Sequence, residues 1–366
     1  MRDHPVNTVV LRRHLPGVVA VLLLLVVARE VWPYADVHQA EVGDGWTVSD
    51  VTMGLGGPTC LEWLDAAHLL VCDRDGGQVH LLSMGLVDGV WTVENQVTWL
   101  DGLDRPHDVL VLNETALVSE SGRLRSIALD AAGPLVPPSG PWTVLIDDVP
   151  TGNHQPNAIN VLPNGTAVWH VGSTCNVCSE ADERNAALVW VNPEDGSHGV
   201  LASGVRNSFD GAWVPGVGYL FSDNGRDWDG DHPPEEVNLL VEGAAYGWPD
   251  DEPDTPVPPG TVGPVATWLP HSSLNGLAVR PATSSLPGGN ATVYATVYGS
   301  WNSVVPVGHE IVRIDLAPSA DGGWEGTTTS FATNLGTPLP IAFHPDGDLF
   351  YATFGGNGRL HVIQAE

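Results

Sequence analysis

Two stretches of the chain share one pattern, namely Pro156-Asn-Ala-Ile-Asn-Val-Leu-Pro-Asn-Gly-Thr-Ala-Val-Trp-His-Val171 and Pro338-Leu-Pro-Ile-Ala-Phe-His-Pro-Asp-Gly-Asp-Leu-Phe-Tyr-Ala-Thr353. In each, an apolar run from the proline reaches a Pro-Asn-Gly or Pro-Asp-Gly turn, and a second apolar run follows. Runs rich in β-branched and aromatic residues between such turns are typical of antiparallel strands. A third strand-like run follows at residues 187–191 and 360–363, so each stretch predicts a small antiparallel sheet.

The pattern recurs in six copies, with a spacing of about 50 residues between the first four, which is typical of repeat architectures. The copies begin at residues 58, 106, 156, 206, 274 and 338. One more strand-like piece precedes each copy and is expected to open it, as at Trp46-Thr-Val, Trp91-Thr-Val, Trp142-Thr-Val and Thr327-Thr-Thr-Ser-Phe. Six units of four strands predict an all-β fold, a six-bladed β-propeller with four-stranded blades over residues 45–366. A β-sandwich is also all-β, but it does not predict six equal repeats.

The heads of the predicted inner strands carry polar side chains that we expect to lie together. In a propeller, the loops that enter the innermost strands and the loops between the second and third strands open on one face. The largest insertions, at residues 172–185, 222–235 and 298–309, fall in these loops and mark a binding face. The sequence therefore predicts a site at one mouth of the central channel. The residues at the strand heads are Arg105, His107, His154, Arg206, Asn207, His271, Asn275 and Thr337.

The composition limits the partners of this 366-residue chain. Its formal net charge is -30, it has no lysine, and all 14 basic residues are arginines. Nucleic acid is not expected as a partner, because binding it takes clustered basic residues that neutralise phosphates. Any anionic ligand needs a local cluster of arginines or a bound cation.

Residues 1–30 have the pattern of an export signal. Arg12 and Arg13 precede an apolar run over residues 15–28, which is typical of a secretory signal and short for a membrane-spanning helix. We expect this segment to be a signal peptide or a retained membrane anchor, with a buried helix of the domain as the alternative. The protein is accordingly predicted to be secreted or extracytoplasmic.

The four cysteines fit a location outside the cytosol, where disulfides persist. Cys60 and Cys72 lie across one predicted hairpin, and Cys175 and Cys178 form a CxxC pair. We expect two local disulfides. A zinc site would need two further cysteine or histidine ligands at finger spacing, which the sequence lacks, and reduced core thiols are the other alternative.

Three features of the predicted mouth can carry chemistry. His154 heads a strand, where an imidazole with an ordinary pKa of about 6.5 can act as a general base, although a structural histidine is the alternative. Arg206 is a natural clamp for carboxylates, unless it pairs with one of the many acids. The segment 223–231 offers oxygens to a hard cation, although it lacks EF-hand spacing and the alternative is a solvated acidic loop. Its candidate ligands are Asp223, Asp227, Asp229, Asp231 and backbone carbonyls.

Segments 204–207, 221–238 and 243–249 closely resemble the glucose/sorbosone dehydrogenase family of soluble quinoprotein propellers. They read Gly-Val-Arg-Asn, Phe-Ser-Asp-Asn-Gly-Arg-Asp-Trp-Asp-Gly-Asp-His-Pro-Pro-Glu-Glu-Val-Asn and Gly-Ala-Ala-Tyr-Gly-Trp-Pro. Residues 172–178, and residues 297–302 with the Pro306 and Gly308 that follow, are similar to the sorbosone dehydrogenase branch. The likeness spans residues 54–364, nearly the whole predicted propeller.

This resemblance implies a propeller that binds pyrroloquinoline quinone (PQQ) and calcium at its top face. A histidine in the position of His154 removes the proton of the substrate hydroxyl, and a hydride passes to the quinone. Arg206 matches an arginine that contacts the cofactor. The further residues implied as cofactor-binding are Asn207, Asn224, Arg226 and Trp301. The calcium ligands implied are the backbone carbonyls of Gly225 and Arg226.

The chain departs from the family pattern at three positions. Ser173 stands where the glucose-oxidising branch has an aspartate that supports the histidine. Ser303 and Thr337 stand where many relatives have a basic residue. Because the quinone has three carboxylates, and an unpaired buried carboxylate costs several kcal/mol, other arginines are needed to neutralise them. The candidates are Arg105, Arg184 and Arg226.

The predicted function is a quinone-dependent dehydrogenase that oxidises a sugar or polyol by hydride transfer to bound PQQ. The alternative is a non-catalytic extracellular propeller that binds carbohydrate or a protein partner. A metal-dependent hydrolase of the lactonase-like propellers would need inward carboxylates at several strand heads, where Asp108 is the nearest acid.

Overall fold

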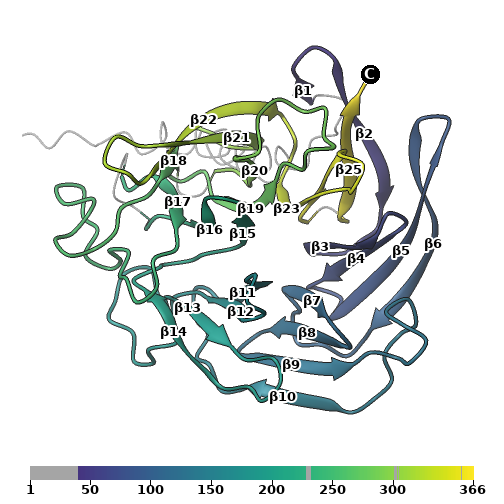
Figure 1. The fold of residues 1–366 in the computed structure, drawn as a ribbon, viewed down its shortest axis with the longest axis horizontal. Coiled ribbons are helices and arrows are strands. Elements are labelled where there is room, and N and C mark those ends of the chain that lie inside the picture. The colour runs from purple at the N-terminus through teal and green to yellow at the C-terminus, as the bar shows by residue number, and fades with distance from the viewer. Residues whose placement is uncertain (1–39, 228–231, 301–302, 304, 356) are drawn as a thin grey trace, which may run out of the picture.

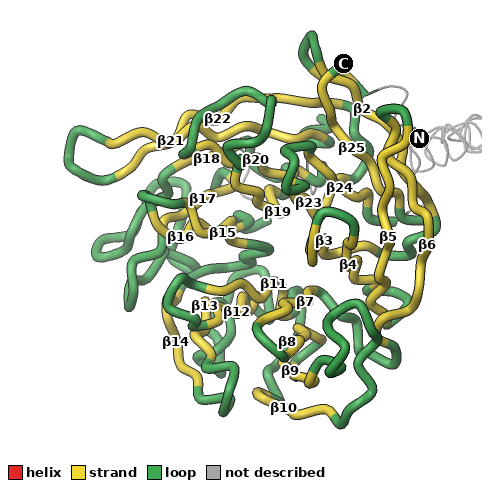
Figure 2. Tube along the Cα trace, turned by 45° about the vertical axis from the view of Figure 1, so that its right-hand side comes forward, coloured by secondary structure: helices red, strands yellow, loops and turns green. Residues whose placement is uncertain are grey.

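The computed structural model describes residues 40–227, 232–300, 303, 305–355 and 357–366. This part of the chain forms 25 strands in six sheets around a central channel (Figure 1, Figure 2). The prediction of an all-β, six-bladed propeller is confirmed. The expected export segment 1–30 and the expected cofactor residue Trp301 lie outside the described residues, as do Asp229 and Asp231. Within the described part, no helix has the length and apolar character needed to cross a membrane.

Each blade is an antiparallel sheet whose strands follow one another from the channel outward. The first blade contains β3 (Pro58–Asp65), β4 (His68–Asp73), β5 (Gln78–Val87) and β6 (Val90–Leu100). The second contains β7 (Asp108–Leu112), β8 (Thr115–Glu120), β9 (Arg123–Ala128) and β10 (Trp142–Ile146). The third contains β11 (Pro156–Val161), β12 (Ala167–Val171), β13 (Ala187–Val191) and β14 (His198–Ser203).

The other three blades have the same order. The fourth contains β15 (Gly211–Val214), β16 (Gly218–Asp223), β17 (Glu235–Leu239) and β18 (Ala266–Trp268). The fifth contains β19 (Leu274–Val279), β20 (Thr292–Val297), β21 (Glu310–Pro318) and β22 (Trp324–Thr333), with β1 (Glu41–Val42) at its outer edge. The sixth contains β23 (Pro338–Phe343), β24 (Leu349–Thr353), β25 (Arg359–Ala365) and β2 (Trp46–Met53).

The ring closes between the two ends of the described chain. Strand β2 pairs antiparallel with β25, from Trp46 opposite Ala365 to Met53 opposite Arg359. An N-terminal strand therefore completes the C-terminal blade, which holds the first and last blades together.

The sequence places each outer strand-like piece in the copy that follows it, and this prediction is wrong. Trp91 and Trp142 lie in β6 and β10, the outermost strands of the preceding blades. The reason is visible between β5 and β6, where Asp88 and Gly89 have φ values of 50° and 79°. Two consecutive residues with positive φ form the tight turn of a two-residue hairpin, so the fourth strand folds back onto the third.

Apolar side chains pack between neighbouring blades, as around Trp169 of β12, which is fully buried. Carboxylates also tie the inner strands to one another. The carboxylate of Asp108 accepts the Ile159 N–H at 2.9 Å. The carboxylate of Asp210 accepts the Leu277 N–H at 3.0 Å. These contacts fix the relative positions of the strand heads that face the channel mouth.

Two disulfides are present, as predicted. Cys60–Cys72 joins β3 to β4, and Cys175–Cys178 closes a short loop between β12 and β13. Among the described residues, the two groups close enough to share a metal ion are these pairs with Asp108 and with Glu180. A disulfide sulfur lacks the thiolate charge that zinc binds, so neither group supports a zinc site.

Candidate functional site

Two cavities open at the predicted channel mouth, and His154 lines both of them. The Arg105 cavity has a volume of about 460 Å³, and its lining includes Arg74, Arg105, His107, Asn157, Asn275 and Tyr298. The Arg206 cavity also has a volume of about 460 Å³, and its lining includes Arg206, Gly225, Asp227, Glu235 and His271. The residues that line both are Asn153, His154, Asn207, Asn224 and Ser273. Volumes of this size are typical of sites for small molecules.

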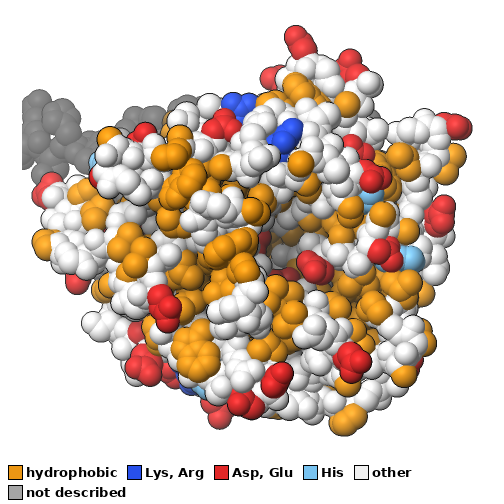
Figure 3. Space-filling view, in the orientation of Figure 1, with side chains coloured by type: hydrophobic (Ala, Val, Ile, Leu, Met, Phe, Trp, Pro, Cys, Tyr) orange, Lys and Arg blue, Asp and Glu red, His pale blue; other side chains and the backbone are white. Residues whose placement is uncertain are grey.

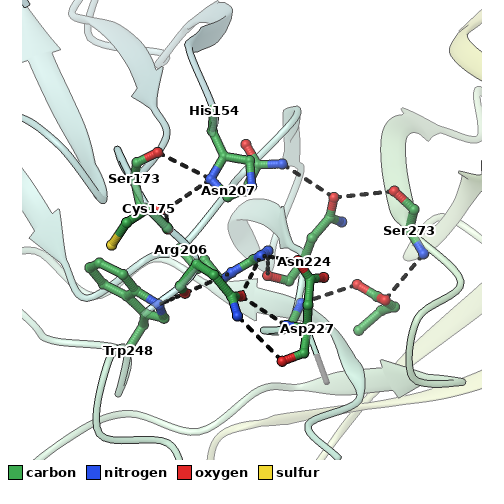
Figure 4. Close-up of polar contacts among 12 residues, drawn as sticks. His154, Ser173, Cys175, Arg206, Asn207, Asn224, Asp227, Trp248 and Ser273 are labelled. Carbon is green, nitrogen blue, oxygen red and sulfur yellow. Dashed lines mark hydrogen bonds and ion pairs between the residues drawn. The ribbon is translucent and has the colours of Figure 1, made fainter. Parts of the chain in front are cut away.

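His154 precedes β11 and is partly buried beside Ser173 (Figure 4). Its Nδ1 lies 2.8 Å from Ser173 Oγ and 3.1 Å from the Ser173 carbonyl oxygen. The Ser173 hydroxyl donates its own proton to the Cys175 carbonyl at 2.7 Å. Nδ1–H is therefore the donor in the pair with Ser173, and a neutral ring then has no proton on Nε2.

The electrostatic surroundings keep His154 neutral. Burial, and then the charge of Arg206, lower the pKa of His154 to about 3. A ring with this pKa has no charge near pH 7, so Nε2 is available as a proton acceptor. Ser173 orients the ring without adding a negative charge.

Arg206 is 4% exposed, and its guanidinium is held by acceptors of the protein (Figure 4). It donates to the Asn176 carbonyl at 3.3 Å, to Asn176 Oδ1 at 2.9 Å and to the Asn224 carbonyl at 3.2 Å. A fourth bond reaches Asp227 Oδ2 at 3.3 Å. Burial lowers the pKa of Arg206, and the charges of Asp227 and Asp223 oppose this shift. Four bonds leave about one of its five N–H donors for a ligand.

Asn176, inside the Cys175–Cys178 loop, links several residues of the site. Its carbonyl accepts the Trp248 indole N–H at 3.0 Å, in addition to the bond from Arg206. Its Oδ1 accepts the Asp227 N–H at 2.9 Å, and its Nδ2 donates to the Asp227 carbonyl at 3.3 Å. The short disulfide loop thus presents one asparagine that fixes both Arg206 and Asp227.

Asn207 and Asn224 continue the polar wall across the third, fourth and fifth blades. Asn207 Oδ1 accepts from Asn157 Nδ2 at 2.9 Å, and Asn207 Nδ2 donates to Asn224 Oδ1 at 3.4 Å. Asn224 Nδ2 donates to the Leu274 carbonyl at 2.6 Å. The Asp223 carboxylate accepts the backbone N–H of Asn207 at 2.7 Å and so holds the backbone of Asn207 in place.

Oxygen donors gather around Gly225 in the Arg206 cavity. Gly225, Asp227 and Glu235 line this cavity together. Glu235 is buried, accepts the Gly225 N–H at 3.2 Å, and has its pKa raised to about 7, chiefly by burial. Carboxylate and carbonyl oxygens are the ligands that calcium takes, so this donor set fits such an ion. The Arg226 side chain lines neither cavity and donates to the Pro249 carbonyl at 3.2 Å.

The positions that depart from the family pattern supply no charge here. Thr337 is buried, and its hydroxyl donates to the Phe354 carbonyl at 2.6 Å. Ser303 is partly buried, and its hydroxyl donates to the Val305 carbonyl at 2.6 Å. Of the three expected substitutes, Arg105 lines a cavity. Arg184 pairs with Asp182 at 2.6 Å, outside both cavities. Arg226 is turned away, as described above.

Several residues of the site were not anticipated from the sequence. Arg74 lies in the loop between β4 and β5. This loop joins the second strand of a blade to the third, and such loops were expected to open on the binding face, so its position could have indicated Arg74. Asn176 and Glu235 have no motif of their own, because their roles come from contacts with Arg206 and Gly225. In contrast, the strand-head histidines and Asn275 line the cavities as expected.

A third cavity, the Glu62 cavity, occupies the channel beyond His107 and has a volume of about 480 Å³. It is lined by residues along the inner strands and includes Glu62, Asp108 and Asp210. Burial, and then the charge of Asp210, raise the pKa of Glu62 to about 7. Figure 3 shows a hollow at the centre of the ring with acidic side chains around it. The carboxylates of this cavity line neither of the two cavities that contain His154, so the hydrolase alternative gains no support from the His154 site.

Comparison by sequence does not assign the chain to a family. No family model matches the chain. An uncharacterised protein of Borreliella burgdorferi is 25% identical over 224 residues, which cover 54% of this chain and 57% of that protein. The match therefore spans little more than half the length of that relative.

Solved structures match nearly all of the propeller. The PQQ domain of pyranose dehydrogenase from Coprinopsis cinerea, in its holo form, is similar with a TM-score of 0.76 and 17% identity over 89% of this chain and 97% of that one. PQQ-bound aldose sugar dehydrogenase from Streptomyces coelicolor has a TM-score of 0.66 and 19% identity over 89% and 100%. The apo form of soluble aldose sugar dehydrogenase from Escherichia coli has a TM-score of 0.67 and 16% identity over 88% and 100%.

At these identities the likeness shows the fold. The chain has the six-bladed propeller fold of the soluble quinoprotein sugar dehydrogenases. The resemblance inferred from residues 204–249 is thereby confirmed at the level of the fold.

Proposed function

We propose that this protein is a quinone-dependent dehydrogenase that oxidises a sugar or polyol, with His154 as the general base. The observation that carries the proposal is a neutral imidazole between two ligand-sized cavities, with Nδ1–H directed at Ser173 and Nε2 free of a proton. The structural likeness to pyranose and aldose sugar dehydrogenases, some of them with bound PQQ, supports the same assignment.

The residues of the Arg206 cavity would hold the quinone. Arg206, Asn207 and Asn224 line this cavity and offer positive charge and amide groups to carboxylates. Trp301 is assigned from the sequence alone, whereas the Arg226 side chain, expected from the sequence to contact the cofactor, lines neither cavity. When bound, the quinone supplies the acceptor for the substrate hydride.

Calcium would bind beside this group. The Gly225 carbonyl is assigned as a ligand from the sequence, as is that of Arg226, and the carboxylates of Asp227 and Glu235 line the same cavity. A related carbohydrate-active enzyme from Trichoderma reesei has a calcium structure, with a TM-score of 0.75 and 17% identity over 89% of this chain and 97% of that one.

His154 would accept the hydroxyl proton at Nε2, because Nδ1 already carries one. A pKa of about 3 makes the resulting imidazolium costly. At pH 7 a gap of about four pKa units corresponds to about 5 kcal/mol. An anion bound next to Arg206 would offset the positive charge that helps to lower this pKa, and would bring the base nearer to the working pH. We therefore expect the anionic ligand to bind before the substrate is oxidised.

We propose further that the protein acts outside the cytosol. Two disulfides support this location, because disulfides are rare in reducing compartments. The segment 1–30 would serve as the signal peptide or membrane anchor. N-terminal sequencing of the protein recovered from medium and from membranes distinguishes a cleaved signal from a retained anchor, and a cytosolic full-length chain would contradict export.

The function is tested by cofactor uptake followed by turnover. The purified protein is loaded with PQQ and calcium, and reduction of an artificial electron-accepting dye is followed with a panel of aldoses and polyols. Bound quinone and saturable turnover are the expected result. A protein that takes up no quinone at tens of micromolar would contradict the dehydrogenase.

A second candidate function is a non-catalytic propeller that binds carbohydrate or a protein partner. It is favoured by the uncharged residues Ser303 and Thr337 and by the four bonds that Arg206 makes within the protein. This function would give sugar binding without quinone uptake, so the same experiment separates the two candidates.

A further inference from the structure

The Arg105 cavity differs in charge from the rest of the molecule. The chain has 44 acidic residues and 14 arginines, yet Arg74 and Arg105 line this cavity and none of its described lining residues is an aspartate or glutamate. Its other polar groups are uncharged side chains such as Asn157 and Asn275, together with His107, whose pKa is lowered to about 3. In so acidic a protein, a positively charged cavity indicates an anionic ligand.

The two guanidinium groups are available to such a ligand. Arg105 is exposed and makes no hydrogen bond or ion pair with another described residue. Arg74 pairs with Asp75 at 2.8 Å, but Asp75 is 58% exposed, and pairs at the surface contribute little. Arg74 also lies 5.9 Å from the ring centroid of Phe354, and after burial its charge contributes most to lowering the pKa of His107. Phe354 and His107 both line the cavity, so Arg74 faces inward.

His154 connects this anionic site to the proposed reaction. It lines both cavities, whereas Arg206, the residue assigned to the quinone, lines the Arg206 cavity. A molecule in the Arg105 cavity can therefore present a hydroxyl to His154 and a carboxylate to the two arginines without displacing the quinone from Arg206.

We infer that the preferred substrate is a sugar acid, a polyhydroxylated molecule with a carboxylate such as a uronic acid. This inference rests on the proposed function and names its substrate class. Arg74 and Arg105 bind the carboxylate, which is unchanged by the reaction. The reacting C–H carbon loses a hydride to the bound acceptor, its hydroxyl loses a proton to His154, and the C–O single bond becomes a double bond.

The inference is tested by binding rather than by turnover. Isothermal titration calorimetry compares glucuronate with glucose, which differ in the carboxylate, on protein with and without bound PQQ and calcium. We expect glucuronate to bind at least about tenfold more tightly, because a charge-assisted pair with arginine is stronger than a neutral hydrogen bond. Arg105→Gln, and the double variant with Arg74→Gln, should remove this preference, so that glucuronate binds no more tightly than glucose. Arg184→Gln, whose guanidinium pairs with Asp182 outside both cavities, is the control and should keep the preference.

Equal affinity for the two sugars would overturn the inference, and so would a preference that survives in the double variant. PQQ also has carboxylates, and these are the other anionic groups that Arg74 and Arg105 would bind. If the double variant loses affinity for PQQ and the unchanged protein shows no preference for glucuronate, the arginines hold the cofactor and the inference is wrong. A preference that depends on Arg105, in a protein that takes up no quinone, would support the anionic site and refute the dehydrogenase instead.

Discussion

Replacing Glu62 by glutamine should stabilise the protein, and more strongly at high pH. Burial and the charge of Asp210 raise the pKa of Glu62 from 4.5 to about 7. An acid whose pKa is higher in the folded state binds more protons there than in the unfolded state. The free energy of unfolding therefore falls as the pH rises from about 4.5 to about 7. Above this range, the folded protein holds an ionised carboxylate that water would solvate better.

The expected size of the effect follows from the pKa. A rise of between two and three pKa units corresponds to about 3 kcal/mol, since one unit is worth about 1.4 kcal/mol. Glutamine has nearly the same shape and does not ionise. Glu62→Gln should therefore raise the free energy of unfolding by about 3 kcal/mol at pH 8 and by about 1 kcal/mol at pH 5.

Unfolding in guanidinium chloride, followed by tryptophan fluorescence at the two pH values, measures this difference. Glu114→Gln is the matched control, because Glu114 lies exposed in the turn between β7 and β8 and should change stability little at either pH. A stabilisation of the same size at pH 5 and pH 8, or a loss of stability at pH 8, would refute the reasoning from burial.

Three further outcomes are expected. Asn176→Ala should weaken PQQ binding about tenfold, because it releases Arg206. Asn176→Asp keeps the acceptor oxygen and should retain most of the affinity. Equal losses of affinity for the two variants in a quinone titration would contradict this role of Asn176. The pH profile of kcat/KM should fall only below the ordinary histidine pKa of about 6.5, because burial lowers the pKa of His154 most and a bound anion offsets only the smaller contribution of Arg206. A fall at 6.5 would argue against the buried base. Glu235→Gln should weaken calcium binding about tenfold in calorimetry, and unchanged affinity would remove Glu235 from the ligand set.

The blades and the meeting of His154 with Arg206 could be predicted from the sequence for one reason. Apolar runs and turn residues repeat along the chain in six copies, and the topology then brings every inner-strand head to one mouth. The pairing of the outer strands could not be read from short pieces such as Trp91-Thr-Val, because such a piece can pair with either neighbour. The Asp88–Gly89 turn was the local signal that decides it.

The rest of the site depends on contacts that no local pattern encodes. Asn176 matters because a disulfide loop folds it against Arg206, and Arg74 matters because its loop reaches the cavity beside His107. The carboxylates Glu62 and Asp210 are unremarkable in the sequence. Their pKa values rise because ring closure buries both of them in one channel.

Turnover of His154→Ala after loading with PQQ and calcium decides whether this imidazole is the base. A positioned general base contributes roughly 10²–10⁴-fold, so kcat/KM should fall by about a thousandfold while the affinity for PQQ is retained. His198→Ala, at an exposed histidine of β14, should keep the turnover of the unchanged protein. Undiminished turnover in His154→Ala, or a loss explained entirely by lost quinone binding, would contradict a proton-accepting role for His154.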